Sequence, residues 1–121
     1  IPGAVVRLRT PQDAGRRANP DRVPAARIRV EEIDEPVLVA GGDADNTWNS
    51  GAMAQNIAER RAEAGGLETV ALIYPGAGHA LSGTGVQRTE GEFRYDEATL
   101  AAQREIWPAT LAFLAEHLKG D

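Results

Sequence analysis

A glycine-rich turn that carries a histidine is the part of this sequence best suited to chemistry. The turn begins at Pro75, and it directly follows an apolar run at residues 70–74. Because proline cannot donate to a strand ladder, Pro75 is expected to end that strand. Gly76 and Gly78 allow backbone angles that are closed to other residues, so the chain can turn tightly. The pattern suits a general base at His79, held off the end of a rigid sheet, better than a core residue. The alternative is a surface loop histidine without a task.

A carboxylate, Asp45, follows an earlier apolar run across a short glycine loop. That run, residues 37–41, is uncharged and rich in β-branched residues, which is typical of a strand covered on both faces. If it is a parallel neighbour of the strand at 68–74, both loops leave the same end of the sheet, where such folds bind ligands. Asp45 can then accept from one ring nitrogen of His79 and leave the other free. The alternative is a turn aspartate that bonds its own loop.

A nucleophile to complete this pair is not evident. A hydrolase of this layout needs serine or cysteine on a sharp turn between a strand and a helix. The chain has no cysteine, and its serines are Ser50 and Ser82. Ser50 lies where a helix cap belongs, and Ser82 has no strand before it. We therefore predict no nucleophile in this chain.

Other polar and aromatic residues in the chain allow further interpretations. Asp43 and Asp45 offer few of the six or so oxygens that a dedicated cation site needs, so no metal site is predicted. The glycine pair of the histidine turn lacks the third glycine of a dinucleotide loop, and no cofactor is predicted. Trp48 is either a core residue or a pocket wall that contacts substrate. His117 is expected to interact with the end of its own helix.

The elements that must position these residues alternate along the chain. A helix is predicted at 51–64 between the two strands, and a final helix runs from a cap at Asp96 to Leu118. Pro108 should kink or locally unwind that helix. The order strand, helix, strand, helix predicts an α/β architecture with a right-handed crossover. Two or three strands leave an apolar edge open, so we expect the sheet to be incomplete in this chain.

Composition divides the chain into two parts. Residues 1–25 are rich in proline, glycine and arginine, and are predicted to form a basic loop or linker before a domain portion at 26–121. Residues 1–30 hold seven arginines against two aspartates, a net charge of +5, although the whole chain carries −5. This basic segment is a solvated linker or meets the phosphates of a cofactor tail or of nucleic acid. Since it has no interleaved aromatic residues, we predict no nucleic-acid partner.

The chain length and a search for targeting and membrane segments indicate the size and the compartment of the protein. A chain of 121 residues is long enough for one domain with a real core. We find no signal peptide and no apolar run long enough to cross a membrane, and therefore expect a cytoplasmic protein without a membrane partner. The first residue is Ile1 rather than methionine, so we expect a processed product or a piece of a longer protein.

Four runs of residues occur in a characteristic order. They are Ile28-Arg29-Val30-Glu31-Glu32-Ile33-x-x-Pro36-Val37-Leu38, then Gly42-Asp43-Ala44-Asp45-x-x-Trp48-Asn49-Ser50, then Tyr74-Pro75-Gly76-Ala77-Gly78-His79, and finally Trp107 with Phe113-Leu114-x-x-His117-Leu118. Over about residues 26–118, this order resembles the C-terminal domain shared by acyl-CoA thioesterases and bile acid-CoA:amino acid N-acyltransferases. Single motifs of the set also occur across the α/β-hydrolases, including relatives of dienelactone hydrolase.

The resemblance implies a partial α/β-hydrolase fold in which Asp45 is the acid and His79 the base of a catalytic triad. It implies an acyl-enzyme mechanism on an acyl-CoA or a related ester. The nucleophile and the oxyanion-hole amides would then lie before Ile1, in an N-terminal half that is covalently attached or a separate chain. The sequence departs from the family pattern at Asn49, where the family has proline, and in lacking the nucleophile turn.

A different class of function is compatible with the same elements. An unpaired apolar strand edge can add a strand from a partner or from a second copy of the chain. The alternative to a hydrolase function is therefore a non-catalytic α/β module that associates through its open sheet edge.

Overall fold

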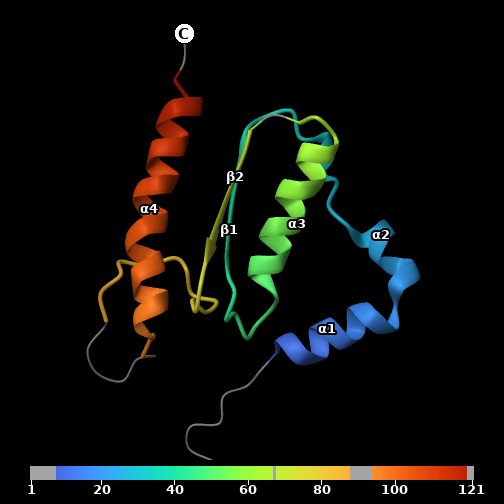
Figure 1. Ribbon diagram of the computed structural model, residues 1–121, viewed down its shortest axis with the longest axis horizontal. Coiled ribbons are helices and arrows are strands. Elements are labelled where there is room, and N and C mark those ends of the chain that lie inside the picture. Colours follow the sequence, from blue (N-terminus) through green and yellow to red (C-terminus); the bar gives the residue numbers. More distant parts are fainter. Residues whose placement is uncertain (1–7, 67, 88–93, 120–121) are drawn as a thin grey trace, which may run out of the picture.

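Two parallel strands lie between two helices at the centre of the structure (Figure 1), a computed structural model that describes residues 8–66, 68–87 and 94–119. Strand β1 (Val37–Gly42) pairs with β2 (Thr69–Tyr74), with Val37 opposite Thr69 and Gly42 opposite Tyr74. Helix α3 (Ser50–Glu63) connects the two strands. The predicted parallel pairing is confirmed, and the even register places the carboxyl ends of both strands level with each other.

The core forms where the helices pack against this sheet. Helix α3 contacts both strands, and α4 (Glu97–His117) contacts them from the other side (Figure 1). Ala54 of α3 and Leu100 and Ala102 of α4 are buried there. The predicted α/β order is confirmed. Within the described residues the sheet has two strands, so each strand has an outer edge without a hydrogen-bonded neighbour.

The segment predicted to be a loop before residue 26 contains helices instead. It folds as α1 (Arg9–Ala18), a 3₁₀ turn η1 (Pro20–Arg22) and α2 (Val23–Ala26), while residues 1–7 lie outside the described part. Pro11, Pro20 and Pro24 mislead because they stand in the first turn of α1, η1 and α2, where a missing N–H has no partner within the helix in any case. Helix α1 is tied to the loop after β1, because the Arg9 N–H donates to the Asn46 carbonyl oxygen at 2.7 Å.

Helix α4 also differs from expectation. It is continuous over 21 residues through Pro108, so the local unwinding predicted as one alternative is absent, and the kink predicted as the other stays a prediction. The predicted cap is confirmed: an Asp96 side-chain oxygen accepts from the Thr99 N–H at 2.8 Å. Four large apolar side chains of the helix or its end stay exposed, namely Trp107, Leu111, Leu114 and Leu118. In the described parts of the chain, no helix combines the length and apolar character needed to cross a membrane.

A buried arginine fastens the segment that leads into β1. Arg61 of α3 is 1% exposed and donates to the carbonyl oxygens of Val30, Ile33 and Glu35 at 2.8–2.9 Å. Its Nε donates to the Thr69 hydroxyl oxygen at 2.7 Å, which ties the same side chain to β2. Because an unpaired backbone carbonyl is costly to bury, this single guanidinium fixes where the chain enters the sheet.

We expect Arg61→Met to lower the free energy of unfolding by about 3 kcal/mol or more, at roughly 1 kcal/mol for each carbonyl that loses its donor. Urea unfolding followed by circular dichroism measures this change. Arg29→Met is the control, since Arg29 forms an exposed ion pair with Glu32 and should cost no more than about 1 kcal/mol. Equal losses in the two variants would contradict the fastening role of Arg61.

Candidate active site

The loops after β1 and β2 leave the same edge of the sheet and are hydrogen-bonded to each other. The Asp43 N–H donates to the Tyr74 carbonyl oxygen at 3.2 Å, and the Ala44 N–H donates to the Ala77 carbonyl oxygen at 3.1 Å. The approach is so close that a Cβ atom on Gly42 would lie 2.2 Å from the Ala77 oxygen. Glycine is therefore required at this position, because any side chain would push the two loops apart.

The histidine turn forms largely as its sequence predicts. Strand β2 ends at Tyr74, immediately before Pro75. Gly76 has a φ of 71°, in the left-handed region where glycine is favoured. Gly78 does not have a positive φ, so the expectation that both glycines supply unusual backbone angles is wrong for the second one. A Cβ on Gly78 would make an ordinary 3.5 Å contact with the Thr99 hydroxyl oxygen.

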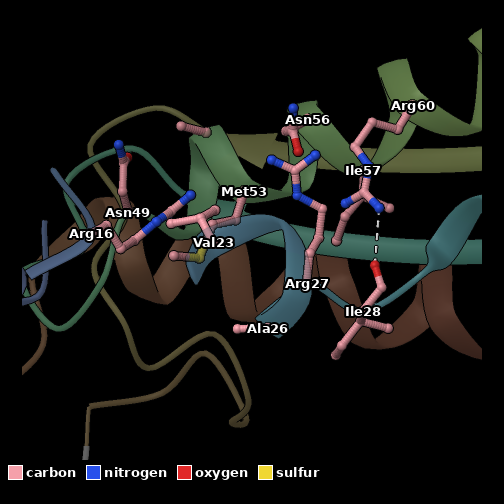
Figure 2. Close-up of a pocket in the computed structure, with 11 residues that line it drawn as sticks. Arg16, Val23, Ala26, Arg27, Ile28, Asn49, Met53, Asn56, Ile57 and Arg60 are labelled. Carbon is pink, nitrogen blue, oxygen red and sulfur yellow. Dashed lines mark hydrogen bonds between the residues drawn. The ribbon is translucent and has the colours of Figure 1, made fainter. Parts of the chain in front are cut away.

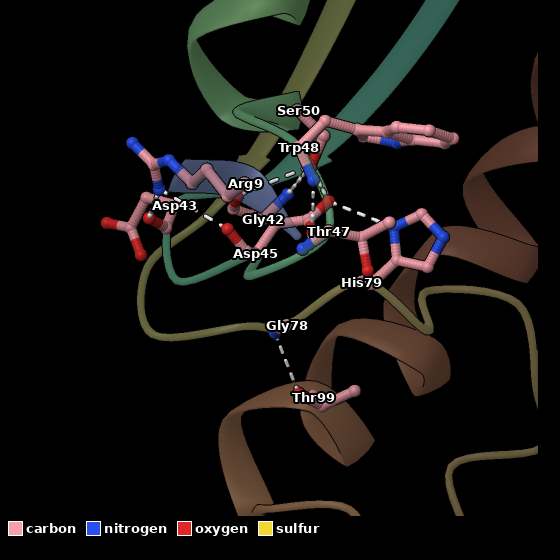
Figure 3. Close-up of polar contacts among 10 residues, drawn as sticks. All are labelled: Arg9, Gly42, Asp43, Asp45, Thr47, Trp48, Ser50, Gly78, His79 and Thr99. Atoms are coloured by element: carbon pink, nitrogen blue, oxygen red, sulfur yellow. Dashed lines mark hydrogen bonds and ion pairs between the residues drawn. The ribbon is translucent and has the colours of Figure 1, made fainter. Parts of the chain in front are cut away.

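These two loops bring the Asp45 and His79 side chains into contact (Figure 3). The Asp45 Oδ2 lies 3.1 Å from the His79 Nδ1. Asp45 is fully buried, whereas 49% of the His79 side chain is exposed. Since a carboxylate can only accept, the contact requires the proton on Nδ1. The Nε2 atom on the far side of the ring is then left to exchange a proton with another molecule.

The Asp45 carboxylate receives donors on both oxygens. Its Oδ1 accepts from the backbone N–H groups of Thr47 at 2.7 Å and Trp48 at 3.2 Å. Its Oδ2 accepts from the Ser50 hydroxyl at 2.6 Å and from His79. Burial raises the pKa of this carboxyl, but the hydrogen bonds from Ser50, His79 and the two amides outweigh it and leave the pKa below its ordinary value. Asp45 is therefore ionised at neutral pH.

Ser50 has a different role from the helix cap predicted for it. It is the first residue of α3, and the cap position is Asn49, whose side chain makes no capping hydrogen bond. The Ser50 hydroxyl instead donates to Asp45 and accepts from the Gly42 N–H at 3.1 Å. The cap is lost because the buried carboxylate competes for the same hydroxyl, and a hydrogen bond to a charged group is the stronger of the two.

Two polar residues of α4 hold the backbone on both sides of His79. The Thr99 hydroxyl accepts from the Gly78 N–H at 2.9 Å, and the Gln103 amide donates to the Ala80 carbonyl oxygen at 2.7 Å. Both side chains are at least 97% buried. Sequence reasoning missed this pair. The one feature of the sequence that could have revealed the pair is its spacing of four residues, which places both polar side chains on one face of the helix together with apolar residues.

The Trp48 ring forms a wall beside His79 rather than part of the core. The two ring centroids lie 5.3 Å apart in an edge-to-face arrangement, and Trp48 is 43% exposed. Both rings line a hollow of about 320 Å³, called here the His79 hollow, whose other walls include Leu81, Ser82 and Ile106. Within the described residues, Ser82 makes no hydrogen bond to His79. Ser82 lies well beyond the end of β2 at Tyr74 and well before the start of α4 at Glu97, so it lacks the sharp turn from a strand into a helix that a nucleophile needs.

The remaining polar candidates either lie apart from this pair or form hydrogen bonds with the backbone. The Asp43 carboxylate accepts from the Gly76 N–H and so joins the two loops. His117 lies beyond the other end of the sheet, where its Nε2 is 3.4 Å from a carboxylate oxygen of Glu68, the residue before β2. Its ring also packs on Phe113 at 4.5 Å between centroids. The structure therefore brings Asp45, Trp48 and His79 together and leaves His117 elsewhere.

The lowered pKa of Asp45 predicts a loss of stability in acid. Because the folded-state pKa lies below the ordinary value of 3.8, the ionised carboxylate stabilises the fold at neutral pH, and this contribution disappears as pH falls from about 5 through the folded pKa. Urea midpoints measured between pH 7 and pH 2 should fall more steeply for the wild type than for Asp45→Asn. Parallel curves for the two proteins would contradict the assignment.

Comparison with known proteins gives one match to a family. The family model described as BAAT / Acyl-CoA thioester hydrolase C terminal matches residues 9–83, which is more than half of the chain. The matched range contains Asp45, Trp48 and His79, begins at the start of α1 and ends before α4. A comparison with curated proteins finds none that matches. The first three motifs read from the sequence lie within the matched range, whereas the fourth, at Trp107 and residues 113–118, lies outside it. The chain belongs to the family of BAAT and acyl-CoA thioester hydrolase C-terminal domains.

Proposed function

We propose that this chain is the C-terminal portion of an α/β-hydrolase that cleaves or transfers the acyl group of an acyl-CoA or related ester, with Asp45 and His79 as the acid and base of its triad. The observation that carries the proposal is the 3.1 Å contact between a buried, ionised carboxylate and a half-exposed imidazole. Such a pair orients the ring and stabilises the positive charge that forms when it accepts a proton.

The chemistry assigned to His79 follows from which nitrogen is free. Nε2 takes the proton of a serine or cysteine nucleophile as that atom attacks the acyl carbonyl carbon. The same proton then passes to the sulfur or oxygen leaving group, and an acyl-enzyme remains. In the second half, water or an amine attacks the acyl carbon and loses a proton to Nε2. The bond between the acyl group and the nucleophile then breaks, and Nε2 returns the proton to the nucleophile. Hydrolysis and transfer therefore place the same demands on Asp45 and His79 and differ in the acceptor.

The nucleophile is proposed to come from an N-terminal half of the domain. Ser50 is bound to Asp45 rather than to His79, and Ser82 lacks the required turn. A sheet of two described strands, with outer edges that lack neighbours, also has room for further strands beside it. Residues 1–25 and residues 26–121 would then belong together to the C-terminal part of a larger domain. Trp48 is proposed as a wall of the acyl-binding pocket, because its ring lines the His79 hollow.

In the protein completed with its N-terminal half, His79→Ala should lower acyl-CoA cleavage on the order of 10²- to 10⁴-fold, the usual contribution of a general base. Release of the free thiol from an acyl-CoA, or of p-nitrophenol from its esters, measures the rate. His117→Ala is the matched control, because it removes a histidine from the other end of the sheet and should leave the rate unchanged. If His79→Ala retains full activity, the triad assignment is wrong.

A second candidate function is favoured by the apolar surface that the structure leaves exposed. Ile73 in β2 is 37% exposed, and α4 exposes Trp107 and Leu111. A non-catalytic module could use such surfaces and an open strand edge to bind a partner or a second copy.

Sedimentation of the chain alone at several concentrations tests this second candidate. If the open edge serves self-association, the average mass should rise with concentration, and a charged substitution at the exposed edge residue, Ile73→Lys, should suppress the rise. A monomer at every concentration would count against an edge-pairing function for this chain.

A further inference from the structure

A second hollow, separate from the His79 hollow, lies between α3 and the helices before β1 (Figure 2). It has a volume of about 650 Å³. One wall is α3, and the other is formed by α1, α2 and the residues that follow α2. We call it the arginine hollow, because it is lined by Arg16, Arg27 and Arg60. These side chains come from α1, from the end of α2 and from α3, so the fold and not the local sequence gathers them.

The three guanidinium groups differ in the contacts that they make with other residues. Arg60 forms an ion pair with Glu31 and donates to the Ile28 carbonyl oxygen, as Figure 2 shows for the second contact. The guanidinium groups of Arg16 and Arg27, in contrast, make no hydrogen bond and no ion pair within the described parts of the chain, although Arg27 is near enough to help lower the pKa of the Glu31 carboxyl. Glu31 offsets one of the three positive charges, and the hollow keeps a net charge of about +2 for an anion to meet.

The walls of the arginine hollow also carry apolar side chains, called here its apolar floor. Met53 and Ile57 of α3 and Val23 and Ala26 of α2 lie between the charged side chains. The asparagine side chains of α3 and its cap add amide donors at the rim. A small inorganic anion would use the charges and leave this floor uncovered. The combination fits an organic phosphate, whose phosphate oxygens match the guanidinium forks while its body covers apolar side chains.

A single short segment separates this hollow from the His79 hollow. Asn49 lines the arginine hollow, while its neighbours in the chain, Trp48 and Ser50, line the His79 hollow. A ligand that fills both must therefore have an anionic end, a reactive end and a flexible connection that passes over residues 48–50. A coenzyme A thioester has this form, with phosphates at one end and the thioester at the other end of a long, flexible arm.

We propose that the arginine hollow binds the phosphate-bearing end of the coenzyme A thioester, with Arg16 and Arg27 as the phosphate ligands. This inference rests on the proposed acyl-CoA function and adds to it the site that holds the coenzyme. It also assigns a role to Arg16 and Arg27 of the basic segment before β1, whereas Arg9 of the same segment donates to the carbonyl oxygens of Asp43 and Asp45.

Binding of free coenzyme A, measured by isothermal titration calorimetry on the protein completed with its N-terminal half, tests the proposal. Coenzyme A should bind more tightly than dephospho-coenzyme A, and pantetheine, which lacks all the phosphates, should bind far more weakly. Arg16→Gln and Arg27→Gln should each weaken coenzyme A binding about tenfold or more, the loss of one hydrogen bond between charged groups. The effect should be smaller at high salt.

Arg29→Gln is the matched control, because it removes the same charge from an exposed arginine that is paired with Glu32 and lies outside the hollow. It should leave coenzyme A binding unchanged. Arg27→Lys keeps the charge but not the planar fork, and should bind with intermediate affinity. Circular dichroism of each variant checks that its helices remain folded.

Three results would overturn the proposal. The first is wild-type affinity in both Arg16→Gln and Arg27→Gln, and the second is equal weakening in Arg29→Gln, which would show general charge attraction. The third is inorganic phosphate or pantetheine binding as tightly as coenzyme A.

Failure of this proposal can be told from failure of the triad. Turnover of p-nitrophenyl acetate, which carries no phosphate, should survive Arg16→Gln and be lost in His79→Ala. Coenzyme A binding should survive His79→Ala and weaken in Arg16→Gln.

Discussion

The buried carboxylate of Asp45 is the group on which the arrangement of this site depends. An ionised group without water must receive hydrogen bonds, and Asp45 obtains four, from two amides, the Ser50 hydroxyl and the His79 ring. These donors come from the loop after β1, the start of α3 and the loop after β2. Satisfying one charge therefore fixes the position of three segments and the orientation of one imidazole.

Helix α4 also holds the His79 loop, through hydrogen bonds to its backbone. Thr99 and Gln103 bind the backbone one residue before and one residue after His79, and both are buried. The ring is thus held by Asp45 through a side-chain contact and by α4 through the main chain. A base that is placed in advance loses little freedom when it accepts a proton, so rigidity on both sides suits the chemistry proposed for it. The exposed edge of the ring faces the His79 hollow, where a reacting group can approach.

The segment from Trp48 to Ser50 connects the site with the basic part of the chain. Ser50 reaches inward to Asp45, Trp48 stands against His79, and Asn49 faces the arginine hollow on the other side. Helices α1 and α2 lie on the same side of this segment as Asn49, and the exposed side chains of Arg16 and Arg27 line a hollow together with residues of α3. The proposed coenzyme site and the proposed triad would then share one wall, so the position of one constrains the other.

The sequence alone determined the strands, both helices that pack on them, and the pair Asp45 and His79, because apolar runs, glycines and prolines act locally on the backbone. It also indicated the family to which the chain belongs. It did not determine the partners of Ser50 or the support from α4, since these depend on which distant atoms compete for a hydroxyl or a carbonyl. Helix α1 was missed because prolines break a helix or begin one according to position. The gathering of Arg16, Arg27 and Arg60 was decided by tertiary structure alone, because their elements meet only when the chain has folded.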